Sequence, residues 1–416
     1  MIMKKILFLA VLTLVSAVTY AGGYRVAVQG NRSLAMGHTG VAVVNSAELA
    51  FHNPAGLVYL ENQLAISAGA TAVFSEVAWQ NQNYGEIYRA DNPVGTPFYL
   101  NAAYKINENF SVGLSVTSPY GSTVEWPTDW PGSHLVNNIS LQAIYIQPLV
   151  AYKIADFISI GGGPILVTGG VEFNRNLTRT LTDINGNRSN VTIDASGVTE
   201  WGWSASAMIN PVDGWRIGVH YRSEVIMNAK GGDADFENVP NTPLAPFQDT
   251  TFDAALPMPA ELAVGVSYEM NEKWLFAFDY NRSYWGVYES LDITFANGVT
   301  SENPRNYKDA SIWRFGAQYA ATDKFTLRAG YYYDETPVQE GYFAPETPRN
   351  DSQGFTAGLS IDVSSRFALD ASFAYVRFSE VDASYDHYVE DGITMPFRGT
   401  YKSNAFIAGL GVTYKL

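Results

Sequence analysis

The sequence predicts an all-β fold: a 14-stranded antiparallel transmembrane β-barrel plugged by an N-terminal hatch. Two observations carry this prediction. Apolar and polar or small residues alternate with a period of two nearly everywhere after residue 62. Short and long connections alternate strictly between these segments along the chain. An up-and-down barrel with short periplasmic turns and long outer loops produces both patterns.

The composition excludes several other classes of protein. The chain has 416 residues and is 47% hydrophobic but only 16% charged, against about 25% charged for typical soluble domains. It contains no cysteine, which excludes a disulfide framework and thiolate metal sites. The net charge of −15 argues against a nucleic-acid partner, because phosphate binding needs a basic face.

Residues 1–21 have the organisation of a secretory signal peptide. Lys4 and Lys5 precede an apolar run from Ile6 to Val18, and Ala21 offers a small residue for cleavage. The alternative, a retained anchor helix, is disfavoured because a membrane span needs about 20 apolar residues. An exported chain with no later apolar run of that length fits the bacterial outer membrane.

Residues 22–61 precede the first strand and do not alternate. They are rich in glycine and alanine, and several apolar residues end the segment: Leu49, Phe51, Leu57, Val58 and Leu60. A barrel of 14 strands has a lumen wider than its own side chains can fill. We therefore expect a hatch at 22–61 inside a barrel at 62–416. A periplasmic tail is the alternative.

The expected strands are taken from the alternation. In the segment 324–333, for example, Phe325, Leu327 and Ala329 share one face, whereas Thr326 and Arg328 share the other. Strands are expected near 63–79, 97–106, 109–125, 138–154, 157–175, 190–210, 214–229, 258–270, 273–285, 308–321, 324–334, 351–363, 366–380 and 403–416.

Tight connections include Asn107-Glu108, Asn271-Glu272 and Thr322-Asp323. The long polar stretches between them are expected to be outer loops. They cover 80–96, 126–137, 176–189, 230–257, 286–307, 335–350 and 381–402. The last strand ends at the carboxyl terminus, Leu416, so that it can pair with the first strand and leave no open edge.

Several short motifs occur in order at equivalent places along the predicted strands. They are Gly22-Gly23-Tyr24, Asn53-Pro54-Ala55, Val116-Thr117-Ser118-Pro119-Tyr120-Gly121, Tyr221-Arg222-Ser223-Glu224-Val225, Tyr307-Lys308-Asp309-Ala310 and Asp334-Glu335-Thr336-Pro337-Val338. With this set the whole mature chain resembles the FadL family of outer-membrane transporters for long-chain fatty acids and other hydrophobic compounds.

The resemblance implies a 14-stranded barrel with a hatch that carries the motif Asn53, Pro54 and Ala55. It implies passive uptake from outside, an apolar lumen, release through a wall gap in the third strand, and no cofactor. We expect a monomer whose partners are a hydrophobic small molecule and outer-membrane lipids, with no nucleic acid. One departure is the short polar stretch 176–189, because family members often have a long, partly helical loop there. The stretch 230–257, with Val239, Leu244, Phe247, Phe252 and Leu256, is an alternative docking surface.

The wall gap is predicted at Ser118, Pro119, Tyr120 and Gly121, inside the third strand. Proline has no N–H and glycine adds no packing, so the ladder should break there. In lipid the unpaired backbone must face protein or a cavity. The alternatives are a bend at the outer rim, or a bulge sealed by a neighbour such as Asn53.

Candidate ligand-binding residues follow from the resemblance and from the alternation of side chains between the two faces of a strand. The family resemblance implies that Tyr24 packs on the ligand chain and that Lys308 holds its carboxylate. Strand parity places Arg314 inside, and Lys308 too if the strand begins near residue 308. Arg175, near the end of the fifth strand, is a second candidate cation. Alternatively Lys308 pairs with Asp309 or with a lumen carboxylate such as Asp279.

No catalytic or metal motif is apparent. The five histidines lack metal-ligand spacing, and there is no nucleophile elbow or phosphate-binding loop. Gly161-Gly162-Gly163-Pro164 is interpreted as a strand bend or close lumen packing. An apolar-compound transporter is therefore favoured over a general porin with a water-filled channel and over a barrel enzyme that would use His220.

Overall fold

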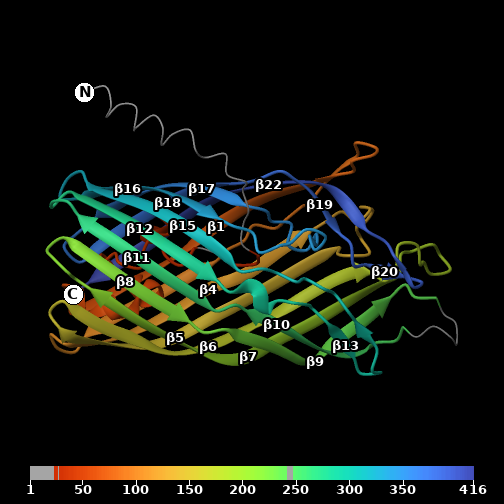
Figure 1. The fold of residues 1–416 in the computed structure, drawn as a ribbon, viewed down its shortest axis with the longest axis horizontal. Coiled ribbons are helices and arrows are strands. Elements are labelled where there is room, and N and C mark those ends of the chain that lie inside the picture. The colour runs from red at the N-terminus through yellow and green to blue at the C-terminus, as the bar shows by residue number, and fades with distance from the viewer. Residues whose placement is uncertain (1–22, 27, 241–246) are drawn as a thin grey trace.

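The protein is a closed antiparallel barrel of 14 strands, elongated along its axis, as the alternation predicts (Figure 1). The computed structural model describes residues 23–26, 28–240 and 247–416. The predicted signal peptide at 1–21 lies outside the described residues. Among the described residues, no helix is both long and apolar enough to cross a membrane.

The first six wall strands are single elements: β1 (Leu64–Gln80), β3 (Phe98–Lys105), β4 (Phe110–Glu125), β5 (Asn138–Ala155), β6 (Ile158–Asn176) and β7 (Asn190–Ile209). The next two are interrupted: β8 (Trp215–Arg222) continues as β9 (Val225–Glu237), and β10 (Thr250–Met258) continues as β11 (Glu261–Glu269). The wall is completed by β12 (Trp274–Ser283), β15 (Ala310–Ala320), β16 (Phe325–Asp334), β17 (Ser352–Asp362), β18 (Phe367–Phe378) and β22 (Phe397–Lys415).

Short strands extend the outer loops: β2 (Ile87–Arg89), β13 (Ile293–Phe295), β14 (Thr300–Ser301), β19 (Val381–Tyr385), β20 (Val389–Glu390) and β21 (Ile393–Thr394). The outer strand ends reach further than expected. Strands β9 and β10 extend into the expected loop 230–257, and β19 to β22 occupy much of 381–402. In these outer ends the exposed face is polar while the face toward the lumen stays apolar, as with Asp253 and Phe252 of β10, so the apolar outer face that marks a membrane strand is lost although the ladder continues.

The barrel closes between its first and last strands. Strands β1 and β22 pair from Ala65↔Lys415 to Gln80↔Thr400. Leu64 and Leu416 also exchange backbone hydrogen bonds of 3.1 and 2.9 Å. The terminal residue is thus part of the ladder, and the wall leaves no free edge between these strands.

The two faces of the wall differ as the alternation predicts. Phe276, Phe315 and Leu327 point outward and are exposed on the surface that lipid covers, whereas Arg314 and Arg328 point inward and are buried. The inward residues are buried because the N-terminal segment fills the lumen on that side.

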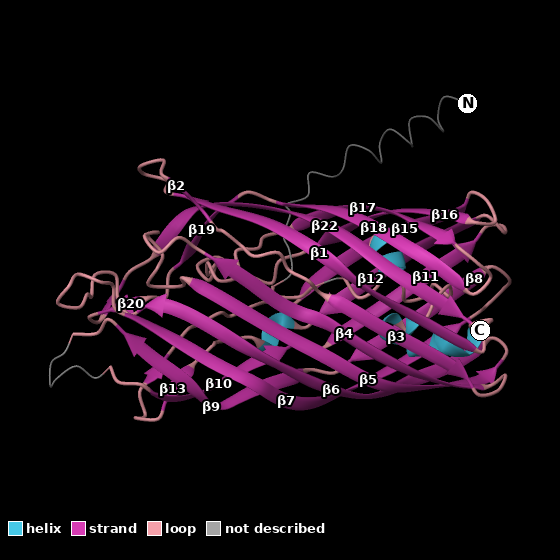
Figure 2. Ribbon diagram, turned by 180° about the vertical axis from the view of Figure 1, so that it is seen from behind, coloured by secondary structure: helices cyan, strands magenta, loops and turns pink. Residues whose placement is uncertain are grey.

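The N-terminal segment lies inside the barrel as a hatch, which Figure 2 shows as short helices enclosed by the strands. Its elements are α2 (Asn31–Ala35), α3 (Leu49–His52) and the 3₁₀ turn η1 (Pro54–Tyr59). A second 3₁₀ turn, η2 (Trp285–Val287), belongs to the loop after β12. The hatch packs closely on the wall: a Cβ at Gly161 would lie 2.6 Å from the Ala55 nitrogen. Gly161 therefore serves close lumen packing, as predicted.

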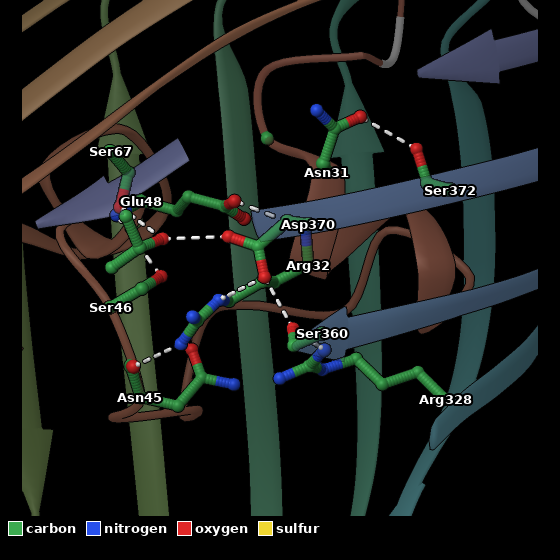
Figure 3. A network of polar contacts seen from close by, with 12 residues as sticks. Asn31, Arg32, Asn45, Ser46, Glu48, Ser67, Arg328, Ser360, Asp370 and Ser372 are labelled. Atoms are coloured by element: carbon green, nitrogen blue, oxygen red, sulfur yellow. Dashed lines mark hydrogen bonds and ion pairs between the residues drawn. The ribbon is translucent and has the colours of Figure 1, made fainter. Parts of the chain in front are cut away.

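A buried ionic network fastens the hatch to β17 and β18 (Figure 3). Arg32 pairs with Asp370 at 2.9 Å, and both side chains are nearly inaccessible to solvent. The Glu48 carboxylate accepts the backbone N–H groups of Arg32 (3.0 Å) and Ser33 (2.9 Å), which caps the first turn of α2. Asp370 also accepts hydrogen bonds from Ser360 and, at 2.7 Å, from Thr413. Arg32 and Asp370 thus form an ion pair, and the Glu48 carboxylate is hydrogen-bonded, as buried charges require.

Candidate functional site

An apolar cavity lies in the lumen, inside β5, β6, β7, β9 and β10. Its volume is about 90 Å³, several times the space that one water molecule needs. Its walls are mostly aliphatic and aromatic, and they include Ile139, Leu141, Val171, Phe173, Ile193, Val198, Met227, Ala229, Phe252, Leu256 and Met258. Such a lining offers little to polar solutes and favours a hydrophobic ligand.

Tyr24 forms one end of this cavity. Its ring packs edge-on against Trp285 at 4.8 Å, Tyr288 at 5.8 Å and Tyr120 at 6.1 Å between centroids. Its hydroxyl donates to the carbonyl oxygen of Pro257. The aromatic third residue of the predicted mature chain therefore contacts the cavity, as its proposed role requires.

Two of the three charged residues that line the cavity are arginines. Arg305 forms an ion pair with Glu346, the third charged residue, and donates to Tyr385 Oη at 3.0 Å. Burial is the largest single influence and opposes its charge, but Glu346 together with the neighbouring tyrosines outweighs burial and raises the pKa of Arg305 above its usual value. Arg175 donates only to the His134 carbonyl (3.4 Å) and Ser301 Oγ (3.2 Å). No ion pair joins Arg175 to a carboxylate in the described part of the chain, so it can neutralise an anionic head group.

Lys308 does not line this cavity. Its side chain is exposed, and its backbone N–H donates to the Pro337 carbonyl at 2.8 Å. The expectation that it points into the lumen assumed a strand from residue 308. Strand β15 begins at Ala310 instead, so the alternation does not extend to Lys308.

Arg314 is inward and buried, as the strand alternation predicts, but it lies against the hatch and does not line the cavity. It donates to the His38 carbonyl at 3.3 Å. It borders a small polar space together with Arg25, His52, Arg222 and Glu261. Its contacts are those of a residue that holds the hatch.

The motif Asn53, Pro54 and Ala55 fastens the hatch to β6 and β7. Asn53 Nδ2 donates to the carbonyls of Val41 (2.7 Å) and Ala207 (3.2 Å). The Ala55 carbonyl accepts from Ser159 Oγ at 2.7 Å, and Pro54 opens the turn η1, where its missing N–H is not needed. Asn53 therefore lies away from the third strand and does not seal it.

The third wall strand, β4, breaks its ladder at the predicted place. Thr117 pairs with Tyr145, but Tyr120 pairs with Ala143, so one extra residue bulges from β4 at Ser118 and Pro119. On its other side β4 pairs with β3 no further than Thr117.

The start of the hatch occupies the unpaired edge of β4. Val26 N–H donates to the Pro119 carbonyl at 2.8 Å, and Gly121 N–H donates to the Tyr24 carbonyl at 3.0 Å. A second cavity of about 370 Å³ lies on the far side of this segment, and both Arg25 and Val26 border it. The two cavities share Ser122, Leu141 and Gln142 in their linings. Residues 24–26 thus stand between the apolar cavity and the wall break.

Sequence reasoning missed four residues of the site: Trp285, Tyr288, Arg305 and Glu346. Tyr288, Arg305 and Glu346 lie in loops that fold inward over the cavity, whereas Trp285 is the last residue of the expected strand 273–285 and packs on Tyr24. The only sequence signal was the cluster of aromatic residues at 284–288 in an otherwise polar stretch.

Comparison with known proteins gives one consistent result. The sequence profile of the family described as "Outer membrane protein transport protein (OMPP1/FadL/TodX)" matches residues 12–416. The "47 kDa outer membrane protein" of Pasteurella multocida is 25% identical, over 98% of this chain and 97% of that protein. The "Long-chain fatty acid transport protein" of Escherichia coli K12 is 23% identical, over 90% of this chain and 92% of that protein.

Two solved structures have the same fold. A Pseudomonas aeruginosa FadL homologue superposes with a TM-score of 0.80 at 18% identity, over 94% of this chain and 99% of that chain. The toluene transporter TodX of P. putida gives a TM-score of 0.73 at 17% identity, over 93% of this chain and 98% of that chain.

Proposed function

Since the chain belongs to the OMPP1/FadL/TodX family of outer-membrane transport proteins, we propose that it takes up long-chain fatty acids or other hydrophobic compounds passively and releases them sideways through the break in β4. We further propose that the signal peptide is removed after Ala21, that residues 22–61 act as the hatch, and that the mature protein is a monomer in contact with outer-membrane lipids.

The apolar cavity supports this proposal as the binding site. Each methylene group that moves from water into such a lining contributes about 0.8 kcal/mol. A ligand carboxylate would lose its hydration on entering, and it needs a cation to compensate. Arg175 lines the cavity without an ion-pair partner in the described chain, so it is the proposed partner of the carboxylate.

The position of residues 24–26 supports the proposed release of the ligand through the break in β4. They bind the unpaired edge of β4 by two backbone hydrogen bonds, and they separate the two cavities. A ligand that displaces Tyr24 would loosen this pairing and join the cavities at the wall break. The neighbouring polar space against the hatch, with Arg25, Arg222 and Arg314, would repel an apolar chain and disfavour straight passage to the periplasm.

A reversible disulfide tests the release step. A Cβ at Gly121 would lie 3.8 Å from Val26 Cγ2, so Val26→Cys with Gly121→Cys should pin the hatch segment to β4. We expect the oxidised double variant to bind dodecanoate but to lose its uptake, and reduction to restore uptake. Each single variant serves as a control. Unchanged uptake in the oxidised, folded double variant would exclude release at this break.

A general porin is the competing function. Liposome swelling separates the two, because an open channel passes free sugars and a hatch-filled barrel does not. Rapid swelling in sugar by the folded protein would contradict the transporter proposal.

A further inference from the structure

A second irregularity lies between β7 and β9 (Figure 1), in the part of the wall that lines the apolar cavity. The ladder joins residues 190–194 of β7 to 237–233 of β9, and residues 204–209 of β7 to 222–217 of β8. Within this fully described region, no ladder pair joins 195–203 to 223–232. We call this unpaired stretch the seam.

Local sequence explains the seam. Gly197 has a φ of +67° and open space around its missing Cβ, and it sits in a bulge where β7 shifts register against β6. At the lower end Ser223 interrupts the strand. Its backbone N–H donates to the Trp203 carbonyl, and its hydroxyl accepts the Trp203 N–H, each at 2.9 Å. Below Ser223 the regular ladder resumes.

The seam opens directly onto the cavity. Val198 on one rim and Met227 and Ala229 on the other all belong to the cavity lining. Outside, Trp201 and Trp203 are 66% and 52% exposed, as expected for the aromatic girdle at a membrane interface. The residues further out are polar and exposed, including Thr199, Asn228 and Lys230. Water can therefore satisfy the unpaired backbone, which hydrocarbon could not.

Few contacts cross the seam above the Trp203–Ser223 hydrogen bonds. Val225 packs against Gly202, where a Cβ would lie 2.6 Å from Val225 Cγ2. The alternation of β7 places Glu200 on the lumen side, with Val198 and Gly202. Its carboxylate nevertheless accepts a hydrogen bond of 2.8 Å from Asn228 Nδ2, which alternation places on the outer face of β9. Above Ser223 the seam is thus bridged by one exposed hydrogen bond among the described residues, and it carries a negative charge.

We propose that the seam is a side entrance, through which uncharged apolar molecules at the membrane–water interface enter the cavity. The lining behind it is apolar, so it favours such molecules, whereas the Glu200 carboxylate repels fatty-acid head groups. Fatty acids enter by another route. This inference rests on the proposed function, because it requires the cavity to be the binding site.

A cross-link across the seam tests the entrance. The chain has no native cysteine, so Thr199→Cys with Asn228→Cys, which are exposed on the two rims of the seam, can be joined by a short bis-maleimide in nanodiscs while the Glu200 carboxylate stays in place. Binding is followed by the fluorescence of Trp285, which packs on Tyr24 at the end of the cavity. We expect cross-linking to slow association and dissociation of dodecan-1-ol by at least about threefold with an unchanged Kd, because a closed gate alters rates and not the bound state. Dodecanoate association should stay at the rate of the unlinked double variant.

The controls separate the possible outcomes. The pair Tyr331→Cys with Phe355→Cys joins two outward residues of a continuous ladder, and linking it should leave both rates unchanged. Glu200→Gln removes the charge without a linker and should raise dodecanoate association by about threefold at low salt, less at high salt. Equal slowing of both ligands, or of neither, would overturn the side entrance. Absence of binding of either ligand to the unmodified protein would instead overturn the proposed function.

Discussion

At the scale of single residues, the cations decide which ligands the cavity holds. Arg305 is neutralised by Glu346, whereas Arg175 has only neutral oxygen acceptors among the described residues. A charge-assisted hydrogen bond is worth about 1.5–3 kcal/mol. We expect Arg175→Gln to weaken dodecanoate binding by about 10- to 100-fold, which is that energy expressed as an affinity ratio. Titration of the purified variant with the ligand measures this.

Two comparisons make the Arg175 result specific. Dodecan-1-ol, which has no charge to pair, should bind the variant as it binds the native protein. Lys308→Ala should leave dodecanoate affinity unchanged, because Lys308 is exposed and lies outside the cavity lining. If Lys308→Ala lost as much dodecanoate affinity as Arg175→Gln, Lys308 would be the residue that binds the ligand carboxylate.

His134, in the loop between β4 and β5, gives the outer region a pH dependence. Burial, followed by the charges of Arg179 and Arg175, lowers its pKa to about 4. An unfolded histidine takes up its proton near pH 6.5, so the folded loop loses stability as the pH falls from about 6.5 towards 4. We expect faster proteolysis of the loop 126–137 at pH 5 than at pH 7.5. In His134→Asn the two rates should be the same.

At the scale of elements, the hatch depends on a few buried contacts with the wall. Breaking a buried ion pair by removing one partner costs about 3–5 kcal/mol. Asp370→Ala leaves Arg32 without its partner and removes the acceptor of Thr413. We expect the barrel to remain folded but the hatch to loosen, so that single-channel recordings show larger and more frequent openings.

Asp382→Asn is the matched control, because Asp382 is exposed on β19 and contacts only Thr400 among the hydrogen bonds of the described residues. Its conductance should equal that of the native protein. If the conductance of Asp370→Ala also equalled that of the native protein, the ionic network would not be needed to keep the hatch closed.

Elements also differ in how far the sequence predicts them. Strands inside the lipid layer alternate because one face meets hydrocarbon, and β12 and β16 start within two residues of their expected positions. The outer ends of β9, β10 and β22 expose polar residues in place of a lipid-facing apolar row, so the sequence predicts loops there. The bulge at Pro119 was predictable because proline lacks a donor. The inward fold of η2 was not, because it depends on tertiary contacts: Tyr24 and Tyr307 pack on both Trp285 and Tyr288.

At the scale of the whole molecule, a closed barrel with its paired ends resists detergent. We expect the unheated protein to migrate on a denaturing gel faster than the boiled protein, with circular dichroism rich in β-structure. Mass spectrometry of the mature protein should give a chain that starts at Gly22. Identical mobility before and after boiling, or recovery in the soluble periplasm, would contradict the membrane barrel.

The pairing of β1 with β22 also fixes the order of events during biogenesis. These partners lie at opposite ends of the chain, so the ring cannot be completed until the last residues have crossed the inner membrane. The hatch precedes every barrel strand in the chain, yet its contacts reach from β6 and β7 to β17 and β18. Loop closure over such separations is slow. The hatch therefore cannot complete its contacts with the wall until the late strands are in place. The pairing of β1 with β22 then closes the barrel around it.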